Sequence, residues 1–314
     1  MSSTGFQDVQ RGHLLTEQAN PRSSDLDALS TAELVQTFCD EDRRPQEAVA
    51  AAAAELTLAI DAIAERLRAG GRLFYLGAGT SGRLGVLDAA ECPPTFCSEP
   101  ELVQGVLAGG APALLRSSEG LEDLAEAGVQ DLVSRGFGSG DALIGIAAGG
   151  TTPYVHGALR HAQSIGALAI AMACVPADQV PMPCDIAIRL LTGPELLTGS
   201  TRLKAGTATK MALNIISTGV MVRLGKVYGN RMVDVAVTNS KLEDRALRML
   251  EDLGGLSRAE GRQWLARSAG SVKLALLMAA ADLSRDQAAD HLSRSHGQLR
   301  AALACLTQDP NGPQ

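Results

Sequence analysis

Five short apolar runs mark the middle of the chain, and helical patterns separate them. The runs lack the apolar–polar alternation of a strand with one solvated face, so they predict strands buried on both faces of a parallel sheet. The sequence therefore predicts an α/β fold, a parallel five-stranded sheet flanked by helices in a flavodoxin-like three-layer sandwich. The runs are residues 73–76, 102–107, 142–147, 167–173 and 186–191.

Helix signals surround these strands. Ser30 and Glu33 form a capping box that opens a short helix, and Pro45 begins a long alanine-rich helix that runs to about Arg68. A second long helix is expected over residues 202–228. Its Met and Leu positions at helical spacing favour core or subunit interface over a cofactor site.

The C-terminal part has a different pattern. Ser257 and Ser284 each begin a capping box followed by an apolar-periodic segment, which predicts a small helical bundle. We therefore expect three parts: an N-terminal arm and short helix at 1–45, the sheet domain at 46–238, and a C-terminal helical domain at 239–314.

Composition excludes several classes of protein. With 46% hydrophobic and 20% charged residues, the 314-residue chain has an ordinary globular composition. An aromatic content of 3% and a net charge of −7 argue against a nucleic-acid partner. The first residues lack a signal-peptide pattern, and no apolar run is long enough to span a membrane. The six cysteines are scattered, so a cytoplasmic protein with no structural metal and no cofactor is expected.

The turn after the first predicted strand carries the clearest chemical signal. Gly79 and Gly82 allow the backbone to approach a ligand closely, while Thr80 and Ser81 add hydroxyls where a helix N-terminus favours an anion. In outline the turn also resembles a dinucleotide fingerprint or a tight crossover. It lacks the Gly-Lys-Ser/Thr ending of a nucleotide loop, and no acidic residue follows the run at 102–107 to bind a ribose. A phosphorylated small molecule is the better ligand.

Two groups of carboxylates could perform acid–base chemistry. Glu91 precedes Pro93 and Pro94, which predict an extended exit and place Glu91 at a helix end, where the dipole disfavours its charged form. The second group lies within residues 119–123 and contains Glu119 and Glu122. Both groups could equally be solvated surface residues, and spacing alone does not show that they converge.

Longer segments carry a resemblance to a known family. Residues 91–95 (Glu-Cys-Pro-Pro-Thr) and 198–208 (Thr-Gly-Ser-Thr-Arg-Leu-Lys-Ala-Gly-Thr-Ala) are similar to specific segments of the N-acetylmuramic acid 6-phosphate etherases. The glycine turn alone marks only the wider sugar isomerase (SIS) fold. The resemblance extends from about residues 15–18 (Leu-Thr-Glu-Gln) to the C-terminal helices. Further matching segments are residues 77–83, 119–123, 152–154 and 229–234.

The resemblance implies a lyase that converts N-acetylmuramic acid 6-phosphate to N-acetylglucosamine 6-phosphate and D-lactate in cell-wall sugar recycling. It implies a cytoplasmic, metal-independent homodimer, with Glu91 as general acid and Glu122 as the second catalytic carboxylate. The alternatives are an aldose–ketose sugar-phosphate isomerase and a non-catalytic sugar-phosphate sensor. The substrate-binding residues expected are Gly79, Thr80, Ser81, Gly82, Glu119, Gly149, Gly150, Thr151, Thr152, Ser200, Arg202 and Lys204.

One loop departs from the family pattern. The family usually has Ala-Ser-Gly-Arg-Thr-Pro-Tyr where this chain has residues 148–154, Ala-Gly-Gly-Thr-Thr-Pro-Tyr. Gly149 and Thr151 therefore replace a serine and an arginine. Loss of a charge-assisted arginine–phosphate bond could weaken binding by about 1.5–3 kcal/mol. We expect Arg202 or Lys204 to compensate, or the substrate to differ.

Overall fold

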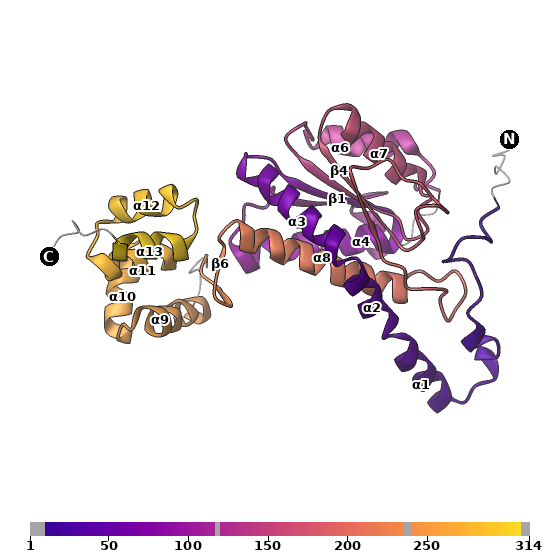
Figure 1. Ribbon diagram of the computed structural model, residues 1–314, viewed down its shortest axis with the longest axis horizontal. Helices are drawn as coiled ribbons and strands as arrows, with labels where there is room; N and C mark the ends of the chain where they lie inside the picture. The colour runs from indigo at the N-terminus through magenta and orange to yellow at the C-terminus, as the bar shows by residue number, and fades with distance from the viewer. Residues whose placement is uncertain (1–9, 117–119, 235–239, 309–314) are drawn as a thin grey trace. The chain divides into compact units, whose positions relative to one another are not determined.

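The computed structural model describes residues 10–116, 120–234 and 240–308 (Figure 1). The chain packs as two compact units. The first contains the residues up to Ala90 and Val103–Ile216, and the second contains Glu91–Leu102 and the residues from Ser217 onward. The division falls inside two helices, and each unit is described by itself.

The first unit is built on a five-stranded sheet with the order β2-β1-β3-β4-β5. All neighbouring strands are parallel, so every strand ends at the same edge. All five predicted strands are confirmed, and β1, β3 and β4 are buried at every position, as continuous apolar runs predict. The strands are β1 (Leu73–Gly77), β2 (Val103–Leu107), β3 (Ala142–Ile146), β4 (Leu168–Ala173) and β5 (Ile186–Arg189).

Helices cover both faces of the sheet, which confirms the three-layer prediction. Helices α6 (Ala125–Ser134) and α7 (Pro153–Ser164) pack on one face, where Leu132 and Leu159 join Phe74 and Leu143 of the sheet in one core. Helix α3 (Ala53–Arg68) lies on the other side, against β4 and β5 (Figure 1).

Two predicted helices differ in extent. The helix expected from Pro45 to Arg68 is interrupted at Ala52, giving α2 (Arg44–Ala51) and α3; no glycine or proline marks this interruption. The helix expected over 202–228 is α8 (Lys204–Arg223). It ends earlier because Gly225 adopts a φ of +79°, and the N–H of Lys226 donates to Met221 O at 2.9 Å, the bond that closes a glycine-terminated helix.

The N-terminal segment is mostly short helices. Ser30 and Glu33 form the predicted capping box of α1. A four-residue helix, α5, follows β2. The elements are η1 (Pro21–Ser23), η2 (Leu26–Ala28), α1 (Thr31–Glu41) and α5 (Pro112–Leu115).

The second unit contains a hairpin and the predicted helical bundle. Ser257 and Ser284 both form the predicted capping boxes. Leu247, Leu250 and Leu277 lie in the buried core of the bundle. Among the helices that the structure describes, none is long and apolar enough to cross a membrane. The elements are β6 (Val227–Tyr228), β7 (Arg231–Met232), α9 (Ser240–Gly254), α10 (Arg258–Arg267), α11 (Val272–Ala281), α12 (Arg285–Arg294) and α13 (Leu299–Gln308).

Candidate active site

The strand order identifies one position at the carboxyl edge of the sheet as a ligand site. The order β2-β1-β3-β4-β5 reverses direction between β1 and β3, and ligands in open α/β sheets bind where the loops after two such strands diverge. These loops are residues 77–82 and 147–152. Both were singled out from the sequence, and the fold brings them to adjacent strands.

The glycine turn after β1 is closely packed. A Cβ on Gly82 would lie 2.3 Å from the carbonyl oxygen of Gly77, so a side chain there would force the turn apart. Gly79 has a φ of +52° and begins helix α4 (Gly79–Phe96). Thr80 and Ser81 thus occupy the first helical turn and are partly exposed. Free backbone N–H groups and the helix dipole give this turn the chemistry of a phosphate site.

The loop after β3 is held against β4. The N–H of Ala147 donates to Met172 O at 3.0 Å, and the N–H of Cys174 donates to Ala148 O at 2.8 Å. Gly150 has a φ of +71°, and a Cβ there would lie 3.1 Å from Val180, so glycine is required at this position. Gly149, Thr151 and Thr152 are partly exposed.

The structure places Glu122 beside this loop through its backbone. The N–H of Tyr154, in the first turn of α7, donates to Glu122 O at 3.0 Å. The side chain of Glu122 is exposed. The segment that carries this carboxylate is therefore fixed at the carboxyl edge of β3. Glu119 lies outside the described residues.

Glu91 is not at a helix end, contrary to the sequence prediction. Helix α4 continues through Pro93 and Pro94 to Phe96. The fixed φ of proline is close to the helical value, so these residues lose hydrogen bonds without reversing the chain. The N–H of Cys97 donates to Pro93 O at 2.9 Å, and the left-handed φ of +49° at Cys97 ends the helix. Glu91 is exposed on the helix that begins at the glycine turn, and its convergence with Glu122 stays a prediction.

A third loop, residues 191–203, leads into α8. Glu195 is fully buried and caps this helix: its carboxylate oxygens accept from the N–H groups of Lys204 at 3.0 Å and Ala205 at 2.9 Å. Burial raises the pKa of Glu195, although these bonds favour the charged form. A Cβ on Gly206 would lie 3.6 Å from Thr80 Cγ2, so the first turns of α8 and α4 are neighbours.

Lys204 is committed to a structural ion pair. Its Nζ donates to Glu41 Oε2, and both side chains are almost completely buried, with exposures of 3% and 5%. Asn20 and Arg22 also donate to the Glu41 carboxylate. Burial alone would raise the pKa of Glu41, but the hydrogen bonds from Lys204 and Asn20 and the nearby positive charges hold it below its usual value.

The remaining predicted residues of the third loop are more accessible. Ser200 is half-buried, and Arg202 is exposed, with no ion pair to any residue that the structure describes. Of the two cations expected to compensate for the missing family arginine, Arg202 is therefore the one with an accessible guanidinium.

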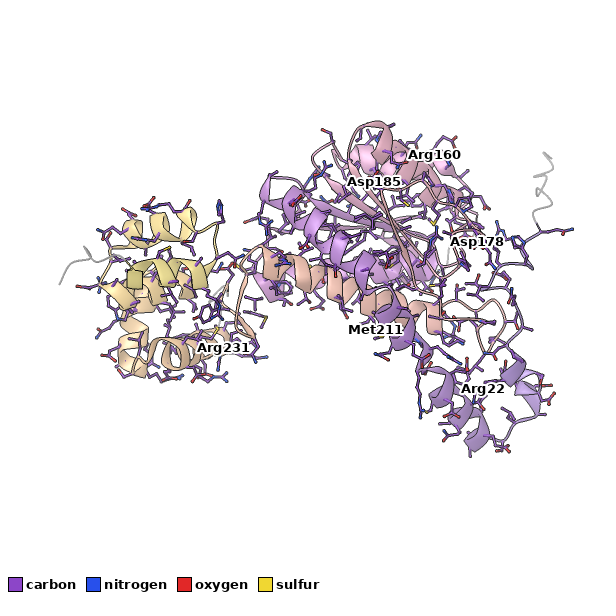
Figure 2. All side chains as sticks on the ribbon, viewed as in Figure 1. Arg22, Arg160, Asp178, Asp185, Met211 and Arg231 are labelled. Carbon is purple, nitrogen blue, oxygen red and sulfur yellow. The ribbon has the colours of Figure 1, made fainter. Side chains whose placement is uncertain are left out.

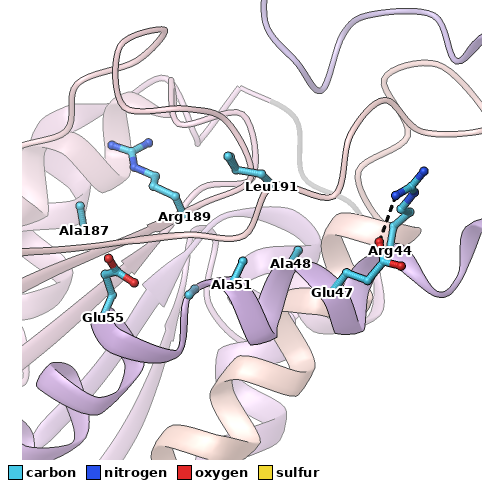
Figure 3. A pocket seen from close by; sticks show the side chains of 9 residues that line it. Arg44, Glu47, Ala48, Ala51, Glu55, Ala187, Arg189 and Leu191 are labelled. Atoms are coloured by element: carbon cyan, nitrogen blue, oxygen red, sulfur yellow. Dashed lines mark hydrogen bonds and ion pairs between the residues drawn. The ribbon is translucent and has the colours of Figure 1, made fainter.

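The largest cavity found in the described part of the chain lies elsewhere. It has a volume of about 410 Å³ and lies between helices α2 and α3 and the edge strand β5, with Arg44 ion-paired to Glu47 at its rim (Figure 3). None of the predicted site residues lines it. The position of the candidate site rests on the strand order and the loops, because this cavity has neither the glycine turn nor the paired loops.

Comparisons with known proteins agree with the fold and the site. Family models described as the N-terminal SIS domain and the C-terminal lid domain of glucokinase regulatory protein match residues 55–163 and 229–273. An N-acetylmuramic acid 6-phosphate etherase of Parasynechococcus marenigrum (strain WH8102) is 74% identical, covering 94% of each chain. One of Synechococcus sp. (strain CC9902) is 75% identical, covering 93% of each chain.

The solved structures are more distant. A protein of E. coli CFT073, solved with a bound ligand, has a TM-score of 0.44 and 15% identity, covering 62% of this chain and 93% of its own, and it carries no argument. The parallel sheet, its glycine turn and the matched domain together define a protein of the sugar isomerase (SIS) class. Within that class, the full-length similarity is decisive. The chain belongs to the N-acetylmuramic acid 6-phosphate etherase family.

Proposed function

We propose that this chain cleaves the D-lactyl ether of N-acetylmuramic acid 6-phosphate, giving N-acetylglucosamine 6-phosphate and D-lactate in cell-wall amino-sugar recycling. The observation that carries this proposal is the identity of 74–75% to etherases over almost the whole chain. The phosphate-binding chemistry of the glycine turn supports a sugar-phosphate substrate.

The reaction is an elimination followed by addition of water. The open-chain sugar has an aldehyde, which acidifies the hydrogen on the neighbouring carbon. Glu122 removes this proton, and Glu91 protonates the ether oxygen as lactate leaves from the next carbon. Glu91 then activates the water that adds to the unsaturated aldehyde. Each proton transfer of this kind contributes typically ~10²–10⁴-fold to the rate.

The phosphate is assigned to the first turn of α4. Backbone N–H groups at Gly79–Gly82 and the hydroxyls of Thr80 and Ser81 would bind its oxygens. The loop at 149–152 and Ser200 complete the proposed sugar site, and Arg202 supplies the positive charge. Lys204 has a structural role in this proposal, because Glu41 already neutralises it.

Neither alternative activity accounts for the site as well. An aldose–ketose isomerase has no ether oxygen to protonate, so it would not need Glu91 together with Glu122. The regulatory-protein domain matches favour a sugar-phosphate sensor, but retention of both carboxylates and the etherase relatives favour the enzyme. We further propose that the enzyme is a cytoplasmic homodimer.

The direct test is release of D-lactate. We expect the purified chain to release D-lactate from N-acetylmuramic acid 6-phosphate, and to do so equally well after treatment with EDTA, because two carboxylates and an aldehyde suffice for the chemistry. Lactate is measured with a stereospecific dehydrogenase. Failure to release it would contradict the proposed function, and activity restored only by a divalent ion would contradict the mechanism.

A further inference from the structure

The N-terminal arm, residues 14–20, is fastened to the sheet unit along its length. Leu14 is buried in the core on the α6–α7 side of the sheet. The N–H of Leu15 donates to Gln179 Oε1 at 3.0 Å. At the other end, Asn20 donates to Pro194 O at 3.0 Å and to Glu41. The arm is therefore a built part of this unit.

Two side chains of the arm lie against loops of the candidate active site. The hydroxyl oxygen of Thr16 would lie 3.5 Å from a Cβ built on Gly149, in the loop after β3. The carboxylate of Glu17 would lie 3.2 Å from a Cβ built on Gly199, in the loop that carries Ser200. The absence of a side chain at Gly149 leaves the Thr16 hydroxyl as the nearest side-chain atom to that position.

The Thr16 hydroxyl has no hydrogen-bond partner. Thr16 is 1% exposed, and its oxygen is one of four buried side-chain polar atoms without a partner in the described part of the chain. Buried polar groups are nearly always paired in folded proteins, so an exception calls for a functional explanation. The other three atoms are Ser98 Oγ, Arg189 Nε and Thr192 Oγ1.

We propose that Thr16 is a substrate-binding residue whose hydroxyl donates a hydrogen bond to an oxygen of the sugar phosphate. This inference rests on the proposed function, and it adds a group from outside the predicted site segments. Glu17, Gln18 and Ala19 are exposed, so this short stretch can shift to admit the sugar while Leu14 and Asn20 remain anchored. Bound substrate then satisfies a hydroxyl that the protein itself leaves unpaired.

The proposal predicts opposite effects on affinity and stability. Thr16→Val keeps the shape of the side chain and removes only the hydroxyl. We expect KM to rise about tenfold with kcat nearly unchanged, the size expected for one lost hydrogen bond. We expect Tm to stay the same or rise, because an unpaired buried hydroxyl is removed. A hydroxyl with a purely structural role would lower Tm and leave KM unchanged.

Two further variants control the experiment. Thr16→Ser keeps the hydroxyl and should retain the wild-type KM. Thr192→Val removes another buried unpaired hydroxyl, after the edge strand β5, and should leave KM unchanged. An unchanged KM in Thr16→Val, or an equal rise in Thr192→Val, would overturn the proposal.

A binding measurement separates this inference from the proposed function. The thermal shift produced by N-acetylglucosamine 6-phosphate needs no turnover, and it should be smaller for Thr16→Val than for the wild type. A chain that releases no lactate but shows this difference would contradict the etherase reaction and support the role of Thr16. Equal shifts in both proteins would refute the role of Thr16, whatever the activity.

Discussion

Lys204 illustrates how the surroundings of one side chain set its role. The sequence motif that contains it indicates a substrate contact, yet its ammonium is buried and paired with Glu41. A buried charge that loses its partner is strongly unfavourable, so this lysine would not exchange Glu41 for a phosphate without cost. Arg202, two positions earlier and exposed, has no such commitment among the described residues.

Isotope exchange separates the roles of the two carboxylates. Glu122→Gln should nearly abolish exchange of the carbon-bound hydrogen with heavy water, because proton removal begins the reaction. Glu91→Gln should retain exchange and block lactate release, since the ether leaves after deprotonation. Each variant should lose ~10²–10⁴-fold in lactate release. Exchange is followed by NMR of the sugar in deuterium oxide.

A nearby carboxylate provides the control for this experiment. Glu126, exposed in α6, is not a proposed site residue, and Glu126→Gln should keep both exchange and lactate release. A Glu122→Gln protein that still exchanges would refute its assignment as base. Equal loss of both signals in both variants would indicate concerted elimination.

At the scale of elements, two glycines allow α6 and α7 to pack in direct backbone contact. A Cβ on Gly128 of α6 would lie 2.2 Å from Tyr154 O, and one on Gly157 of α7 would lie 2.2 Å from Ala125 O. This contact fixes the start of α7, where Tyr154 binds the backbone of Glu122. The close packing of two helices therefore helps to position a proposed catalytic segment.

Gly157→Ala should destabilise the protein by about 1–3 kcal/mol, because the methyl group must push α6 and α7 apart. Helix propensity alone would favour alanine by about 1 kcal/mol, so the sign of the change decides which effect dominates. Gly138→Ala is the matched control, since a Cβ there meets nothing within 4 Å. Urea unfolding measures both; a Gly157→Ala protein as stable as the control would contradict the packing argument.

At the scale of the whole molecule, α8 presents apolar side chains at the surface of the sheet unit. Ile215 is 42% exposed, and with Met211 it lines an apolar groove of about 370 Å³ against α2 and α3 (Figure 2 labels Met211). Apolar surface of this kind is a candidate for the proposed homodimer interface. The groove is distinct from the carboxyl-edge loops that form the candidate active site.

Ile215→Asp should convert a dimer to a monomer at micromolar concentration, because a carboxylate would be buried without a partner at the interface. Val133→Asp replaces an apolar residue that is 56% exposed on α6 and should leave the dimer intact. Sedimentation velocity distinguishes the two states. A monomeric wild type, or a dimeric Ile215→Asp protein, would remove α8 from the proposed interface.

The sequence by itself determined the features whose signals are local. Strands buried on both faces need continuous apolar runs, so all five could be located without tertiary information. The capping boxes at Ser30, Ser257 and Ser284 each involve residues three positions apart, and they form as expected. The glycine turn at 77–82 was equally clear, since close backbone approach needs glycine wherever it occurs.

Tertiary structure decided the features that depend on the path of the chain. Lys204 and Glu41 are 163 positions apart, and no spacing rule relates them. The same is true of Thr16 and Gly149, which meet because the arm is fastened along the carboxyl edge. Helix α4 passes Pro93 and Pro94 and ends only at the left-handed Cys97. Local rules reach about one helical turn, whereas the partner of a buried charge or hydroxyl is chosen by packing over the whole unit.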